Sequence, residues 1–135
     1  MKISLVAASL LAAPLRLPLY SHGIAAGFPS PADDYIEQAL DLNEHLIKHP
    51  AATYYARANG NSLSGRGIID KDLLVIDRSL APQDGDIVVA ALDGDLCCKI
   101  LDLKHRQLRS AHIDCPPIPI PDESDLIIEG VLIHA

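Results

Sequence analysis

Short apolar segments separated by turn residues dominate the chain beyond Pro50. Alternation of Val, Ile, Leu and Ala runs with Asp, Gly and Pro is typical of β-strands joined by turns. The hairpin between two of these strands is expected at Asp93-Gly94, a dipeptide that favours tight reversals. The sequence therefore predicts a small, mostly β domain, closed or strongly curved, with strands over residues 53–58, 73–76, 86–92, 95–103, 107–111 and 126–133.

The first fifty residues have a different character. Residues 15–26 are interrupted by proline and glycine and predict an exposed arm. Apolar residues at three- and four-residue steps predict one helix within 33–48, firmest over 41–48. Near the other end, residues 115–121 carry four prolines, which lack the backbone donor that a central strand needs. We expect that segment to be a rigid connector or a sheet edge.

Length and charge exclude several classes of protein. The chain has 135 residues, enough for one domain with an arm, and its formal net charge is −7. An acidic chain without a basic patch argues against direct nucleic-acid binding. No apolar stretch reaches the ~20 residues that a membrane-spanning helix needs. The three cysteines have neither metal-type nor framework spacing, so we expect reduced thiols and a cytoplasmic protein.

The first thirteen residues leave an alternative open. A lysine followed by the apolar run 3–13 resembles the start of a secretory signal peptide, and Ala25-Ala26 before Gly27 resembles a cleavage site. Pro14 and Arg16 argue against export, because they end the apolar run well before that site.

Two separate residues are candidates for nucleophilic chemistry. Ser62 lies in the turn Gly60–Gly65, and Lys99 lies in the apolar run 96–101 without an adjacent acidic residue. A serine hydroxyl becomes a nucleophile when a base accepts its proton, and a lysine serves as that base only in its neutral form, which burial favours. The residue types alone also fit a turn serine and an edge lysine. Strand alternation predicts Cys97 and Lys99 on one face and Cys98 and Ile100 on the other.

Other candidate sites have weaker support. Ser64 shares the turn, and Cys97 would need a histidine partner that the sequence does not place. His45 and His49 are four residues apart on the predicted helix, but no third metal ligand lies near them in the sequence. The acidic residues around Gly85 and Gly94 are better explained by turns than by calcium loops.

A set of short motifs occurs in the order found in the UmuD family, which belongs with the self-cleaving serine proteases of the LexA type. From about Leu15 onward the chain resembles that family along nearly its whole length. The motifs are Gly27–Tyr35, Asp41-Leu42-Asn43, His49–Tyr54, Gly60-Asn61-Ser62, Gly67-Ile68, Asp72-Leu73-Leu74, Gly85–Val88 and Asp93-Gly94.

The resemblance implies a fold, an activity and partners. It implies a LexA/signal-peptidase-like β domain over 51–135, preceded by an extended segment with a short helix over 27–50. Ser62 would be the nucleophile, Lys99 the general base, and the backbone N–H groups of Asn61 and Ser62 the oxyanion hole. Residues 1–26 would form an arm removed by cleavage between Ala26 and Gly27.

The same resemblance implies partners and a setting. Cleavage would be stimulated by a RecA filament on single-stranded DNA. The shortened homodimer would then serve a UmuC-type polymerase in error-prone translesion synthesis during the SOS response. The resemblance implies no metal and no organic cofactor.

The chain departs from the family pattern beside the nucleophile, where Asn61 and Leu63 stand in place of the usual Asp and Met, and residues 1–14 do not follow the pattern. Two alternatives therefore stand beside self-cleavage: a non-cleaving binding module with the same fold, and an exported β domain with a signal peptide. A LexA-like repressor is disfavoured, because 26 residues before Gly27 are too few for a helix-turn-helix domain.

Overall fold

The computed structural model describes residues 1–6, 16–20, 36–92, 94–120 and 127–135. The chain divides into two compact units. One unit combines Met1–Ala8 with His49–Ala135, and the other is Ser9–Lys48. Ala26 and Gly27, the expected cleavage site, lie outside the described residues.

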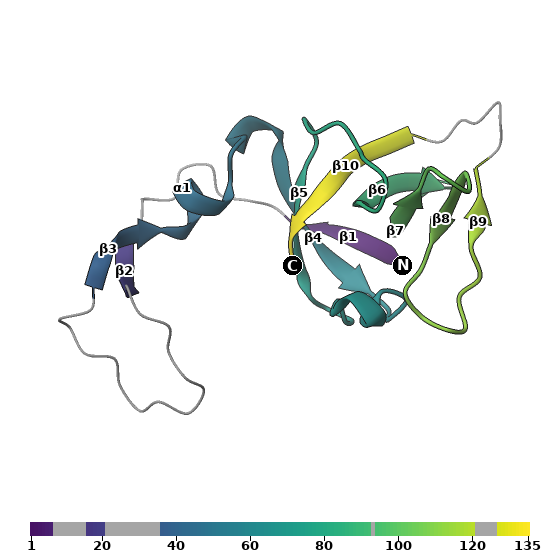
Figure 1. Cartoon of the computed structure of the whole chain (residues 1–135), viewed down its shortest axis with the longest axis horizontal. Helices are drawn as coiled ribbons and strands as arrows, with labels where there is room; N and C mark the ends of the chain where they lie inside the picture. Colours follow the sequence, from purple (N-terminus) through teal and green to yellow (C-terminus); the bar gives the residue numbers. More distant parts are fainter. Residues whose placement is uncertain (7–15, 21–35, 93, 121–126) are drawn as a thin grey trace. The chain divides into compact units, whose positions relative to one another are not determined.

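The larger unit is a closed antiparallel barrel. Its strand order is β1-β4-β5-β10-β6-β7, and a pairing between β1 and β7 completes the circuit (Figure 1). Every strand in it is therefore paired on both sides along part of its length, which leaves little open sheet edge. The prediction of a mostly β, closed domain is confirmed. The strands of the circuit are β1 (Lys2–Val6), β4 (Thr53–Asn59), β5 (Leu73–Asp77), β6 (Ile87–Leu92), β7 (Asp95–Asp102) and β10 (Ile127–His134).

Two short strands extend the sheet beyond β7. β8 (Gln107–Arg109) pairs with the second half of β7, and β9 (Ile118–Pro119) pairs with β8 at the sheet edge. Proline is tolerated at an edge because no ladder donor is required there, so the edge prediction for the proline segment is confirmed. The 3-10 turn η2 (Pro50–Ala52) precedes β4. A second 3-10 turn, η3 (Ser64–Arg66), begins two residues after Ser62.

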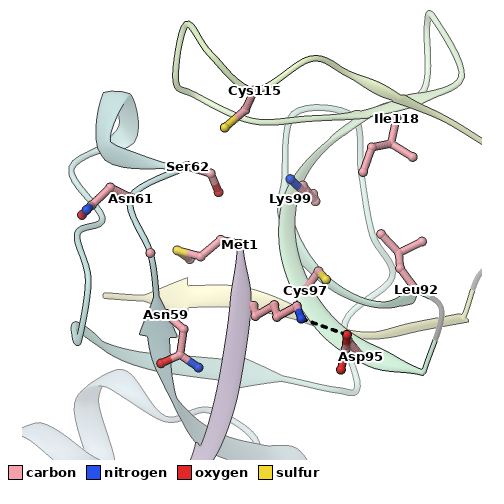
Figure 2. Close-up of a pocket in the computed structure, with 12 residues that line it drawn as sticks. Met1, Asn59, Asn61, Ser62, Leu92, Asp95, Cys97, Lys99, Cys115 and Ile118 are labelled. Atoms are coloured by element: carbon pink, nitrogen blue, oxygen red, sulfur yellow. Dashed lines mark ion pairs between the residues drawn. The ribbon is translucent and has the colours of Figure 1, made fainter.

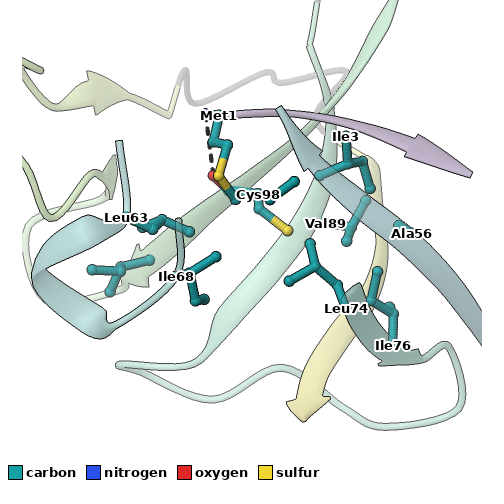
Figure 3. Close-up of a cluster of buried hydrophobic side chains, with 11 residues drawn as sticks. Met1, Ile3, Ala56, Leu63, Ile68, Leu74, Ile76, Val89 and Cys98 are labelled. Atoms are coloured by element: carbon teal, nitrogen blue, oxygen red, sulfur yellow. Dashed lines mark hydrogen bonds between the residues drawn. The ribbon is translucent and has the colours of Figure 1, made fainter. Parts of the chain in front are cut away.

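Alternating side chains fill the two faces of the sheet. Val89 packs in one hydrophobic cluster, and its neighbours Val88 and Ala90 pack in a second cluster with Leu101. This period of two is what a strand covered on both faces produces. The larger cluster is shown in Figure 3 and comprises Met1, Ile3, Ala56, Ala58, Leu63, Ile68, Leu74, Ile76, Val89, Cys98 and Ile100.

The smaller unit contains a two-stranded sheet and one helix. β2 (Arg16–Tyr20) pairs antiparallel with β3 (Ile36–Asp41), and α1 (Leu42–Leu46) follows directly. The helix predicted within 33–48 is confirmed over 42–46 and wrong over 36–41, which form β3, and over 47–48, which follow the helix, whereas residues 33–35 lie outside the described residues. The helix begins where the Asp41 carboxylate accepts a hydrogen bond from the Asn43 N–H at 3.1 Å, the arrangement of an N-cap.

Two parts of the expected N-terminal arm are regular strands. Lys2–Val6 is a strand of the barrel, and Arg16–Tyr20 is half of the two-stranded sheet. Polar Lys2 and Ser4 alternate with Met1 and Ile3, which are buried in the core, and this is a strand pattern rather than an arm pattern. Pro18 is accommodated because a two-stranded sheet consists of edge strands. Among the described residues, no helix is long and apolar enough to cross a membrane.

Candidate active site

The turn that carries Ser62 follows β4 and is attached to the barrel core. Leu63, the next residue, is 0% exposed and packs in that core, which fixes the position of Ser62 at the edge of the core. The Asn61 side-chain oxygen accepts a hydrogen bond from the Asp70 N–H at 2.9 Å, and Asp70 in turn accepts from the Gly60 N–H at 2.7 Å. The two positions that depart from the family pattern, Asn61 and Leu63, therefore both stabilise the turn that carries Ser62.

Lys99 lies at the point along β7 where the neighbouring strand on one side changes from β1 to β8. Just before it, the Cys98 N–H donates to the Met1 carbonyl of β1 at 2.7 Å, and just after it, Ile100 pairs with Arg109 of β8. Cys98 and Ile100 face the barrel core, whereas Cys97 and Lys99 line a pocket. The alternation predicted for this strand is confirmed. Lys99 is 9% exposed, which is unusual for a lysine.

Ser62 and Lys99 open onto the same pocket. Its volume is about 450 Å³, and β1, the serine turn and β7 all contribute to its walls. Figure 2 shows the two side chains directed into one space, with Met1 beside them. Cys97 and Cys115 also line it, and both are free and half-buried.

The two candidate residues are not hydrogen-bonded to each other in this structure. Lys99 Nζ donates to Ser110 Oγ at 2.8 Å. Ser62 Oγ is buried and has no hydrogen-bond partner among the described residues. Buried hydroxyls are nearly always bonded, so an exception calls for an explanation. The pocket is therefore lined both by a hydroxyl without a protein partner among the described residues and by a buried amine.

A two-residue segment contacts both the side chain of Lys99 and the backbone of Ser62. Ser110 holds the Lys99 amine, and the N–H of the next residue, Ala111, donates to the Ser62 carbonyl at 2.7 Å. The Ala111 carbonyl in turn accepts from the Gly65 N–H at 2.8 Å. A side chain at Gly65 would place its Cβ 2.7 Å from the Ala111 oxygen, so only glycine permits this approach. The distance between the serine turn and β7 is thus set by the segment Ser110–Ala111.

Few negative charges reach the pocket. Burial, with a further contribution from nearby Lys99, lowers the pKa of the Met1 amino group to about 6. Burial raises the pKa of the Cys98 thiol to about 12, so that thiol is unreactive. Lys2 and Asp95 form an exposed ion pair at 3.2 Å on the rim. Among the described residues, no carboxylate forms an ion pair with Lys99.

Ser64, His45 and His49, the other candidate residues, do not line this pocket. Ser64 is exposed in η3. His45 lies on α1, but the helix ends at Leu46, and His49 instead hydrogen-bonds Asp77. No group of three metal-ligating side chains occurs within the described part of the chain.

Sequence reasoning missed Met1, Cys115 and Ser110 as pocket neighbours. No local pattern marks these residues, because long-range pairing brings them to the site.

The closed antiparallel barrel presents a buried serine hydroxyl and a buried lysine to one pocket, which are the residue types that serine peptidases with a lysine base require. The Peptidase S24-like family profile matches residues 18–133, and the chain belongs to that family of peptidases. This match confirms the resemblance to the UmuD and LexA group.

Relatives support the same assignment. Protein ImpA of Salmonella typhimurium is 44% identical over 117 residues, covering 87% of this chain and 81% of ImpA. Protein MucA of Escherichia coli is 42% identical over 121 residues, covering 88% of this chain and 83% of MucA. A LexA repressor from Halorhodospira halophila is 36% identical over 111 residues, covering 80% of this chain and 49% of the repressor.

Proposed function

We propose that this protein is a self-cleaving serine peptidase in which Ser62 is the nucleophile and Lys99 the general base. The observation that carries the proposal is the unbonded, buried Ser62 hydroxyl in the same pocket as the buried Lys99 amine. Membership of a peptidase family supports the reaction class. The substrate bond is Ala26–Gly27 of the protein's own chain.

The chemistry needs only these two side chains and backbone donors. Neutral Lys99 Nζ accepts the Ser62 hydroxyl proton as Oγ attacks the Ala26 carbonyl carbon. Backbone N–H groups of Asn61 and Ser62 stabilise the oxyanion. The C–N bond then breaks, Lys99 returns the proton to the Gly27 nitrogen, and an ester joins Ala26 to Ser62. Water hydrolyses that ester with Lys99 again as base, releasing residues 1–26 and regenerating Ser62.

The setting proposed for this reaction is DNA damage. A RecA filament on single-stranded DNA would stimulate cleavage, and the shortened form, as a homodimer, would join a UmuC-type polymerase for translesion synthesis. Similarity to ImpA and MucA over most of the chain supports this setting.

The test is self-cleavage of the purified full chain, with and without a RecA filament, at pH 7 and at mildly alkaline pH. Mass spectrometry should identify a fragment beginning at Gly27, and the two pH values show whether its rate of formation depends on pH. Ser62→Ala should abolish it, and Ser64→Ala, in the same turn, should not. Cleavage that survives Ser62→Ala would refute the mechanism.

A second candidate is a binding module that does not cleave itself. The observation in its favour is that Lys99 donates to Ser110 and not to Ser62 in this structure. Association with a UmuC-type polymerase subunit, without a Ser62-dependent fragment under any of these conditions, would favour the module over the peptidase.

A further inference from the structure

β1 is held unequally by its two neighbours. Along β4 it forms a register of five residue pairs, from Lys2 opposite Asn59 to Val6 opposite Tyr55. Along β7 the register contains one pair, Lys2 opposite Cys97, and Met1 exchanges backbone hydrogen bonds with Cys98 at 2.7 and 3.4 Å. β1 thus fills a gap one strand wide between β4 and β7, which we call the strand channel.

The two proposed catalytic side chains lie beside one end of the strand channel (Figure 2). Ser62 lies three residues beyond the end of β4, and Lys99 is a residue of β7. Met1, at the start of β1, lines the pocket that contains them and is 8% exposed. β1 begins beside these two side chains and leads away from them (Figure 2), so an extended segment that occupied the strand channel and continued beyond the position of Met1 would pass the Ser62 hydroxyl and the Lys99 amine.

Little in β1 is specific to its own sequence. Its bonds to the neighbouring strands are made largely by the main chain, which every non-proline peptide can reproduce. Met1 and Ile3 are its side chains in the core, whereas Leu5 is 63% exposed. The Lys2–Asp95 ion pair is exposed and contributes little. A second extended peptide with apolar residues at alternate positions has the same means of binding.

We infer that the strand channel between β4 and β7 is a binding site for an extended peptide, and that β1 occupies it as an intramolecular competitor. A peptide can be cut at Ser62 only after β1 has left. The catalytic consequence rests on the proposed function, whereas the binding site itself does not.

The first experiment measures peptide binding without catalysis. A fluorescent synthetic peptide with the sequence of residues 20–28, which contains no proline, is titrated against Ser62→Ala protein that also carries Ile3→Asp or Leu5→Asp. Both changes add one carboxylate to β1, but Ile3 is buried and Leu5 is exposed, so Ile3→Asp should expel β1. We expect at least about tenfold tighter binding with Ile3→Asp, in line with removal of a competitor.

Hydrogen exchange at the Cys98 amide reports whether β1 has left, because that amide donates to Met1. Thermal unfolding reports whether the barrel persists. Equal peptide affinity in the two variants, with the Cys98 amide exposed and the barrel folded, would overturn the inference.

The second experiment locks β1 in place and does not depend on expelling it. Because Met1 and Cys98 form the hydrogen-bonded pair, Lys2 and Cys97 form the closer, non-bonded pair of the antiparallel ladder. Lys2→Cys should therefore form a disulfide with Cys97. In the oxidised protein, self-cleavage should be at least about tenfold slower, and peptide binding at least about tenfold weaker, than in the same protein after reduction. Lys2→Ser is the control, and neither its cleavage nor its peptide binding should respond to the oxidant.

The two hypotheses fail in different ways. Ser62-dependent cleavage at equal rates in oxidised and reduced Lys2→Cys protein would refute the competitor role of β1. Peptide binding that responds to β1, with no Ser62-dependent fragment from any variant, would refute the proposed function and support the strand channel.

Discussion

Two serine-containing polar clusters lie in the barrel unit, and they are built in opposite ways. In the first, which we call the carboxylate cluster, Asp77 is 1% exposed and accepts from the Ser79 hydroxyl at 2.6 Å and the Ser79 N–H at 2.8 Å. His49 Nδ1 lies 2.6 Å from its other oxygen. In the second, the pocket, Lys99 donates to Ser110, and Ser62 Oγ has no partner among the described residues.

The carboxylate cluster contains the residue types of a Ser-His-Asp triad but not its order of contacts. In a triad the serine hydroxyl bonds to histidine, and the aspartate orients the opposite ring nitrogen. Here the Ser79 hydroxyl donates to the Asp77 carboxylate and not to the His49 ring, so the histidine cannot accept its proton directly as it would in a triad. A satisfied cluster stabilises the fold. The Ser62 hydroxyl, by contrast, donates to no group among the described residues.

The largest effect expected from this contrast is loss of self-cleavage in Lys99→Met. Methionine fills similar space without an amine, so the barrel should keep or gain stability while the cleavage rate falls about a thousandfold or more. The appearance of the Gly27 fragment measures it, and Lys104→Met in an exposed turn is the control. A Lys99→Met protein that cleaves itself at the normal rate would remove the distinction between the two clusters.

A smaller effect is expected from Gly65→Ala. The new Cβ would approach the Ala111 carbonyl to 2.7 Å, so the serine turn must shift away from Ser110–Ala111. Displacement of a catalytic group by about 1 Å can cost about a hundredfold, and we expect cleavage to slow about ten- to a hundredfold. Exposed Arg66→Ala is the control. An unchanged rate together with a lowered melting temperature would show that the segment stabilises the fold without setting the site.

How much of the fold and of the site can be predicted from the sequence depends on how far apart in the sequence the contacting residues lie. The β6–β7 hairpin, the faces of Lys99 and Cys98, and the β9 edge were predictable because turn residues, alternation and proline act locally. Residues 36–41 were misassigned because their apolar spacing fits a helix or a strand, and the pairing with β2 decides between them.

The strand β1 was missed for a different reason. Its partners are residues 55–59 and Cys97, so no local pattern connects it to the barrel. Ser110 was likewise unpredictable as the partner of Lys99, since the β7–β8 pairing brings them together. The sequence thus predicts which side chains share a face, and the fold decides which of them meet.

Ser110→Ala should produce an effect of a few-fold. Ser110 touches Lys99 and not the substrate bond, so we interpret it as a positioning residue. Without the hydroxyl, the Lys99 amine samples more orientations, and we expect cleavage to slow about three- to tenfold. Ser110→Thr keeps the hydroxyl and should restore the rate. Equal slowing by alanine and threonine would indicate a packing role and bring Ser110 closer to the carboxylate cluster in function.

The smallest effect on cleavage, close to none per folded molecule, is expected from Asp77→Asn. Its effect should be on stability, about 1–3 kcal/mol, because a buried acceptor of three contacts is altered. Asp114→Asn is the matched control, since the side chain of Asp114 is 84% exposed and lies 3.9 Å from His112. The midpoint of urea unfolding at pH 7 compares the two variants.

At acid pH, the difference in stability against unfolding between Asp77→Asn and the unmodified protein should disappear. Burial opposes ionisation of Asp77, but hydrogen bonds from Ser79 and His49 outweigh it and hold the pKa of this carboxyl below its usual value. A lowered pKa contributes stability that is complete above the unfolded value of about 3.9 and is lost as the pH falls through the folded value. The melting temperatures of the two proteins should therefore converge below about pH 4. Convergence without any change in cleavage per folded molecule at pH 7 would place Asp77 in the scaffold, whereas slowed cleavage would mean that the carboxylate cluster contributes to the chemistry of the pocket.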